Sequence, residues 1–111
     1  MAERRTQPGQ LHVDVTRTDR QIVVTLRGDV DVYSSAQLRE ELTSLIDDGP
    51  DAVVLDLAGL DFLDSTGLGV LVGAQKRLVQ RGGELILRAP RPGARKVFEI
   101  TGLDKVFVVE D

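Results

Sequence analysis

Apolar and polar residues alternate in two short stretches near the start of the chain. The alternating apolar positions are Leu11, Val13 and Val15 in the first stretch and Ile22, Val24 and Leu26 in the second. A period of two residues is typical of a strand with one buried face. The short polar link over residues 17–20 favours an antiparallel hairpin between these strands. Residues 1–10 are mostly polar and contain Pro8-Gly9, so we expect a flexible tail before a domain that spans 11–111.

Helical spacing replaces this alternation in the next segment. Leu38 is followed by apolar residues four, seven and eight positions later, at Leu42, Leu45 and Ile46, which places all of them on one face of a helix. A Ser-x-x-Gln pattern over residues 34–37 predicts a capping box at the start of this helix, and Gly49-Pro50 predicts its end. The run Gly28-Asp29-Val30-Asp31 before the helix is expected to end the second strand.

The second half of the chain alternates strands and helices. The apolar run 52–55 predicts a strand buried on both faces, and residues 59–64 are expected to form a turn after it. A helix is predicted from Ser65 to Arg81. Its expected core residues are Leu68, Leu71, Val72, Leu78 and Val79, with Val70 and Ala74 outside that arc.

Three further elements are predicted after the second helix. Residues 85–87 form a short strand, and Pro92 opens a third helix that Gly102 caps. The core candidates of this helix are Val97, Phe98 and Ile100, and residues 106–109 predict an edge strand. The order ββαβαβα(β) indicates an α/β fold, because a helix between successive strands implies parallel pairing. We therefore expect a single domain with a mixed, mostly parallel sheet of four to five strands.

Composition narrows the possible functions. Lys and Arg total 14 and Asp and Glu total 18, which gives a net charge of −4 and argues against direct nucleic-acid binding. The chain has no cysteine, which excludes thiol catalysis and thiolate metal sites, and no apolar run long enough to span a membrane. The N-terminus lacks the apolar stretch of a signal peptide, so we expect a cytoplasmic protein.

The junction between the central strand and the second helix carries the chemical signal. Ser65 stands where the helix begins, at the positive end of its dipole. Taken alone, a serine at this place is more often an ordinary N-cap than a functional group, and either Asp64 or Ser65 suits that role. Gly67, Gly69 and Gly73 each cost a helix about 1 kcal/mol relative to alanine. They indicate close packing, a bare surface beside Ser65 that another protein approaches, or both.

The run Phe62-Leu63-Asp64-Ser65-Thr66-Gly67-Leu68-Gly69-Val70 resembles the phosphorylation-site motif of bacterial anti-sigma factor antagonists, single-domain members of the STAS family. Two further runs are similar to family turns, 28–31 after the second strand and 82–85 before the fourth. The run 97–103 is similar to the family's later helix and cap. One departure is the lack of room for a further C-terminal helix after residue 109.

The resemblance implies a regulatory binding protein, not an enzyme, and no cofactor or metal. Its unphosphorylated form is expected to bind a kinase-type anti-sigma factor and so release a sigma factor. Phosphorylation of Ser65 by that serine kinase abolishes binding, and a phosphoserine phosphatase restores it. A phosphate there adds about −1.5 to −2 charge, which the helix amides tolerate but the partner's pocket does not. The expected partner-binding residues are Asp29, Asp31, Asp64, Thr66, Gly67, Leu68, Gly69 and Gly73.

Other chemistries fit the sequence less well. A nucleotide-binding module that holds phosphate at Ser65–Gly69 is the main alternative, but Gly67-x-Gly69-x-x-x-Gly73 departs from the dinucleotide spacing. The only histidine, His12, is expected to be exposed on the first strand, away from Ser65, which disfavours a serine hydrolase. The carboxylates that could gather around Mg²⁺ are Asp29, Asp31, Asp56, Asp61 and Asp64, although turn and capping roles explain them more simply.

Overall fold

A computed structural model describes residues 10–111; residues 1–9, which make up all but the last residue of the predicted tail, lie outside the described part. The strands are β1 (Leu11–Arg17), β2 (Gln21–Val30), β3 (Ala52–Leu63), β4 (Glu84–Arg88) and β5 (Val108–Glu110). The helices are α1 (Ser35–Asp47), α2 (Ser65–Gln80) and α3 (Pro92–Thr101), with a short 3-10 turn at Leu103–Lys105.

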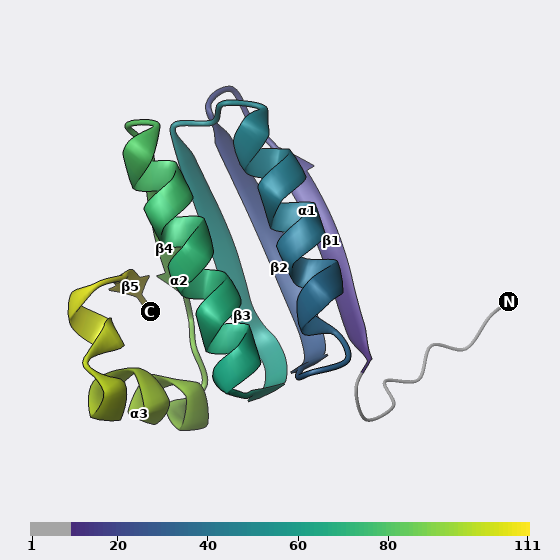
Figure 1. The fold of residues 1–111 in the computed structure, drawn as a ribbon, viewed down its shortest axis with the longest axis vertical. Coiled ribbons are helices and arrows are strands. Elements are labelled where there is room, and N and C mark those ends of the chain that lie inside the picture. The colour runs from purple at the N-terminus through teal and green to yellow at the C-terminus, as the bar shows by residue number, and fades with distance from the viewer. Residues whose placement is uncertain (1–9) are drawn as a thin grey trace, which may run out of the picture.

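One five-stranded sheet in the order β1-β2-β3-β4-β5 organises this domain. β1 pairs antiparallel with β2, and the other three pairings are parallel. Helices α1 and α2 lie side by side on one face of the sheet, and α3 lies near the end where α2 begins (Figure 1). The predicted α/β class, element order and mixed sheet are confirmed.

The core lies between the sheet and these helices. The strands contribute alternate residues such as Val24, Leu26 and Leu55, all fully buried, because a strand's side chains point to its two faces in turn. The predicted face of α1 is buried throughout. On α3 the prediction is partly wrong: Phe98 is buried against Phe107, whereas Ile100 is 75% exposed.

The buried face of α2 is rotated from the predicted one. Leu71 and Leu78 are buried as expected, but Val79 is 57% exposed. Val70 and Ala74, which the sequence pattern places outside the core arc, are buried. The reason is that α2 packs against α1 as well as the sheet, and a helix with two neighbours buries a wider and shifted arc.

Two expected turns are strand instead. β2 continues through Gly28 to Val30, and β3 continues through Gly59 to Leu63. Gly28 has φ +103 and lies at a shift in the β2–β3 register, so its flexibility absorbs a bulge and the pairing resumes. A Cβ on Gly59 would lie 2.7 Å from Cγ of Arg27, so this glycine permits close approach of the strands. Both strands therefore end together, at the edge where α2 begins.

Two local predictions on the first half of the chain are also wrong. Ser34 is the N-cap of α1 but makes no capping hydrogen bond to the helix, so the capping box is absent. Its oxygen accepts instead from the N–H of Asp31 at 3.0 Å, because the turn before the helix supplies a nearer donor, and its hydroxyl donates to the carbonyl of Asp29 at 2.8 Å. His12 is half-buried rather than exposed, since it lies on β1 opposite Arg27 of β2.

Candidate functional site

The candidate site is the start of α2, where the chain leaves the end of β3. Asp64 is the N-cap, with extended backbone angles. Its N–H donates to the carbonyl of Val30, the last residue of β2, at 3.1 Å. Its own carbonyl accepts the first helical bond, from Leu68 N–H at 2.9 Å. The first turn of α2 is thus joined to the end of β2 by a main-chain hydrogen bond and to the end of β3 by the continuing chain.

The Asp64 carboxylate holds this turn from its side chain as well. Oδ1 accepts a hydrogen bond from the N–H of Gly67 at 3.0 Å and another from the hydroxyl of Thr66. The Thr66 hydroxyl, and after it the Gly67 N–H, hold the pKa of the Asp64 carboxyl below its usual range. Of the two cap readings offered by the sequence, Asp64 is the cap. Ser65 is therefore not used to close the helix.

The two adjacent hydroxyls of the motif have different surroundings. Thr66 donates to Asp64, which fixes its side chain inside the cap. Ser65 is exposed, and its hydroxyl has no hydrogen-bond partner in residues 10–111. The exposed hydroxyl of Ser65, at the N-terminus of the helix, is accessible to another protein. The hydroxyl of Thr66 would first have to break its hydrogen bond to Asp64.

The three glycines of α2 have two different roles. Gly67 is buried, and a Cβ at this position would lie 2.5 Å from Leu63 Cδ1 and 2.6 Å from Val30 Cγ1. It therefore lets the helix approach the strand ends. Gly69 and Gly73 are exposed, and a Cβ on either would meet no atom within 4 Å. The close-packing reading is confirmed for Gly67, and Gly69 and Gly73 leave a bare helix surface; that another protein approaches this surface stays a prediction.

The turn between β2 and α1 lies beside this start. Strand pairing places Asp29 opposite Phe62 and Val30 opposite Leu63, so Asp31 follows at the same edge of the sheet as Ser65. Asp31 Oδ1 accepts from the N–H groups of Tyr33 at 2.9 Å and Ser34 at 3.1 Å. This turn is therefore fixed by its own carboxylate, in the way that Asp64 fixes the first turn of α2.

Of the remaining predicted site residues, Leu68 is half-buried and packs against the core. The turn and capping roles expected for the acidic residues are found for Asp31 and Asp64, whereas Asp56 lies within β3, where its Oδ1 accepts from Ala58 N–H at 3.0 Å. Asp61 forms an ion pair with Arg91 at 2.7 Å. Within residues 10–111 no three acidic or imidazole groups gather in a way that would hold a metal ion.

The geometry also bears on the nucleotide alternative. A phosphate at a helix N-terminus needs free N–H groups. Here the N–H groups of Gly67 and Leu68 already donate to Asp64, and its carboxylate occupies the position that an anion would take. The capping carboxylate of Asp64 therefore disfavours a nucleotide phosphate at this turn.

Three exposed apolar residues surround the site, and sequence patterns did not identify them. Val32 and Tyr33 lie in the turn after β2 and are 61% and 85% exposed, and Phe62 near the end of β3 is 52% exposed. Large apolar side chains in the open are typical of interaction sites when they cluster. The sequence signal that could have identified this surface is the apolar pair Val32-Tyr33, because a polar turn between a strand and a helix needs no apolar residue.

Comparison with known proteins matches this architecture to one family. The STAS domain model matches residues 12–111. An anti-sigma-B factor antagonist of Bacillus subtilis is 38% identical over 96 residues, which cover 86% of this chain and 87% of that protein. None of the helices within residues 10–111 is long and apolar enough to cross a bilayer.

Solved structures agree with the family match. The crystal structure of an anti-sigma factor antagonist from Mycobacterium paratuberculosis superposes with a TM-score of 0.86 at 30% identity, over 95% of this chain and 89% of that one. The Bacillus cell fate determinant SpoIIAA in its phosphorylated form gives a TM-score of 0.71 at 28% identity, over 88% and 90% of the two chains. The chain therefore belongs to the STAS domain family, in its group of anti-sigma factor antagonists.

Proposed function

We propose that this protein binds a kinase-type anti-sigma factor in its unphosphorylated form, and that phosphorylation of Ser65 abolishes this binding. The observation that carries the proposal is the contrast between two neighbouring hydroxyls. Ser65 is exposed and has no partner among the described residues, whereas Thr66 is held by Asp64. The related protein SpoIIAA has been solved in a phosphorylated form, which supports a covalent switch on this fold.

The phosphorylation step needs a kinase with bound ATP. The Ser65 oxygen attacks the γ-phosphorus, ADP leaves, and the hydroxyl proton passes to a base of the kinase. The first turn of α2 stays in place during this step, because Asp64 and not Ser65 holds its cap. Ser65 is thus modified without loss of any hydrogen bond within the described residues. A phosphoserine phosphatase then returns the protein to its binding form.

The binding surface in this proposal surrounds Ser65. Asp29 and Asp31 supply negative charge from the neighbouring turn, while Tyr33 and Phe62 supply apolar area that a partner buries. Aromatic residues of this kind commonly contribute most to the affinity of an interface. The bare backbone at Gly69 extends this surface along α2.

The switch acts through charge and size. A phosphate on Ser65 adds about −1.5 to −2 charge next to a site that already holds the Asp64 and Asp31 carboxylates. A partner surface shaped for these two carboxylates then meets uncompensated charge and a larger group, and like-charge contacts of this kind cost several kcal/mol. The domain itself keeps its fold, so binding is lost without rearrangement of the sheet or helices.

The direct test is incubation with candidate anti-sigma factor kinases and Mg-ATP, followed by intact mass analysis. We expect the unsubstituted chain to gain one phosphate, Ser65→Ala to gain none, and Thr66→Val to be modified still. A phosphate found on Thr66, or unchanged modification of Ser65→Ala, would contradict the proposal. Since the expected kinase uses cytosolic ATP, the proposal also places the protein in the cytoplasm.

A further inference from the structure

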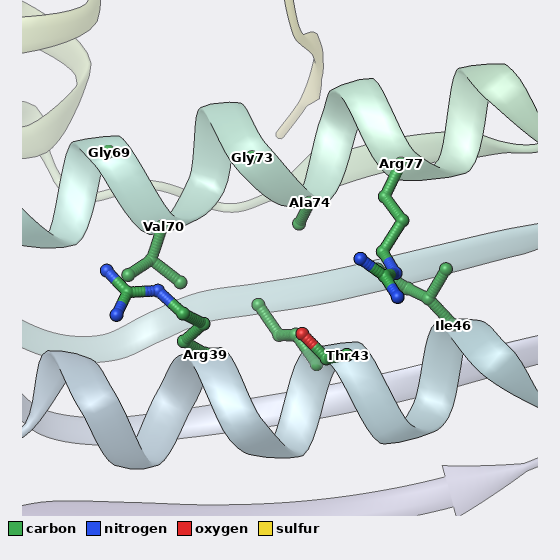
Figure 2. Close-up of a pocket in the computed structure, with 9 residues that line it drawn as sticks. Arg39, Thr43, Ile46, Gly69, Val70, Gly73, Ala74 and Arg77 are labelled. Carbon is green, nitrogen blue, oxygen red and sulfur yellow. The ribbon is translucent and has the colours of Figure 1, made fainter.

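A groove runs between α1 and α2, beyond the motif around Ser65. It has a volume of about 160 Å³. Buried apolar side chains, Val70 and Ala74 of α2 among them, form its floor. Gly69 and Gly73 border it on the α2 side, and the side chains of Arg39 and Arg77 lie over it (Figure 2). We call this feature the α1–α2 groove.

Arg39 differs from the other arginines that the structure describes. Every other arginine within residues 10–111 forms an ion pair with a carboxylate. Arg39 forms none and makes no hydrogen bond within this range. No residue three or four positions away on α1 is acidic, so the helix itself offers no partner. In the described part of this acidic protein, the Arg39 guanidinium is thus the one left unpaired, and it lies over an apolar groove.

The positive charge of Arg77, the second arginine of the groove, is only partly compensated. Arg77 Nη2 lies 3.4 Å from Asp47 Oδ1, and Arg81 contacts the same carboxylate at 3.6 Å. Asp47 is therefore shared between two arginines at long distance. A carboxylate placed over the groove would find Arg39 free and Arg77 only partly compensated. The charge of the groove is complementary to an acidic segment.

The shape of the groove selects the kind of segment. A Cβ on Gly69 or Gly73 would meet no atom within 4 Å, so the backbone of α2 is open to direct contact. A partner helix fits best in the shallow channel between two parallel neighbours, with its apolar side chains on the floor. A small-molecule ligand fits less well, because such sites usually enclose about 300–1,000 Å³.

We propose that the α1–α2 groove receives an acidic amphipathic helix of the anti-sigma factor, with one of its carboxylates paired to Arg39. This inference rests on the proposed function and adds a second contact to it. Ser65, Gly69 and Gly73 are spaced four residues apart on α2, so they lie along one side of the helix. A phosphate on Ser65 therefore lies at the end of the same groove, where its charge repels the acidic helix.

Two substitutions test this contact without disturbing the core. Arg39→Glu reverses the unpaired charge, and Gly73→Leu fills the open channel. Arg39 is exposed and Gly73 faces open space, so both variants are expected to fold, which circular dichroism and thermal unfolding verify. The matched controls are Lys96→Glu on α3 and Ser44→Leu on α1, which make the same kinds of change at exposed positions outside the groove.

Binding is measured to the anti-sigma factor that phosphorylates Ser65 in the experiment above. We expect each groove variant to bind at least about tenfold more weakly, and each control within about twofold of the unsubstituted chain. The same kinase should show a raised KM and an unchanged kcat on both groove variants, because the Ser65 hydroxyl is untouched. The loss caused by Arg39→Glu should shrink at high salt.

The failure of this inference is separable from failure of the proposed function. If both groove variants bind like the unsubstituted chain while phosphorylation of Ser65 still abolishes binding, the groove is not a contact and the proposed function stands. If only Arg39→Glu is affected, a helix does not enter the groove and the inference is wrong. If the unsubstituted chain is neither bound nor phosphorylated by any anti-sigma factor, both proposals are wrong.

Discussion

Alanine substitution at two glycines of α2, six positions apart, should change stability in opposite directions. Gly73→Ala places a methyl group in open space, because no atom lies within 4 Å of the added Cβ. Gly67→Ala places the same group 2.6 Å from Val30 Cγ1 and 2.5 Å from Leu63 Cδ1. Both variants make one chemical change in one helix, so their difference isolates packing from helix propensity.

The size of each effect follows from these contacts. Gly73→Ala gains up to about 1 kcal/mol, the usual advantage of alanine over glycine inside a helix. At Gly67 the methyl group forces a shift of Val30, which is β-branched and fully buried, and such overpacking costs about 1–3 kcal/mol. After subtraction of the propensity gain, Gly67→Ala should be destabilised by about 0–2 kcal/mol. The two variants should then differ by the overpacking cost alone, about 1–3 kcal/mol.

Urea unfolding followed by circular dichroism measures both values on the same scale. A thermal scan should show Tm raised for Gly73→Ala and lowered for Gly67→Ala, by roughly 4 °C for each kcal/mol in a domain of this size. If Gly67→Ala is as stable as Gly73→Ala, the close approach of α2 to the strand ends is not what requires glycine there, and the account of the first turn is wrong.

Three further outcomes are expected. Ser65→Ala should bind the kinase-type anti-sigma factor whether or not ATP is present, and Ser65→Asp should bind it more weakly than Ser65→Ala; equal affinities in a binding titration would refute the switch. The pKa of Asp64 is lowered in the fold, so its contribution to stability is complete above the ordinary value of 3.8 and fades as the pH falls below it. The free energy of unfolding is measured from pH 6 to pH 2, about the range over which such carboxylates titrate. Over this range it should fall less in Asp64→Asn than in the unsubstituted chain. Tyr33→Ala and Phe62→Ala should weaken binding at least about fivefold without lowering Tm, because both side chains are largely exposed, whereas Ile100→Ala should leave affinity unchanged.

Local patterns in the sequence carried most of the fold. The alternation at Val24 and Leu26, and the helical spacing of Leu38 and Leu42, each report the burial of single faces, and the structure buries these residues. The motif at Ser65 was equally readable, because a hydroxyl beside an N-cap is a local arrangement.

Features that depend on distant segments were not predictable in the same way. The sequence around Gly28 predicts a turn, but the pairing of β2 with β3 continues past this residue and makes it part of a bulge within the strand. Val70 and Val79 exchange their expected burial, because a helical pattern does not reveal that α1 lies alongside α2. Whether Arg39 forms an ion pair depends on which carboxylates folding brings near it, so no local sequence motif predicts that it has none within residues 10–111.

The main-chain bond from Asp64 to Val30 gives the recognition surface a mechanical property. The turn that carries Tyr33 and the turn that carries Ser65 are anchored to the same strand end, which restricts movement of one turn relative to the other. A partner that docks here has little chain to immobilise, and most of the contact energy is available as affinity. In the proposed switch, a phosphate on Ser65 would therefore change the charge and shape of a surface whose backbone is already fixed, without a conformational search by a loop.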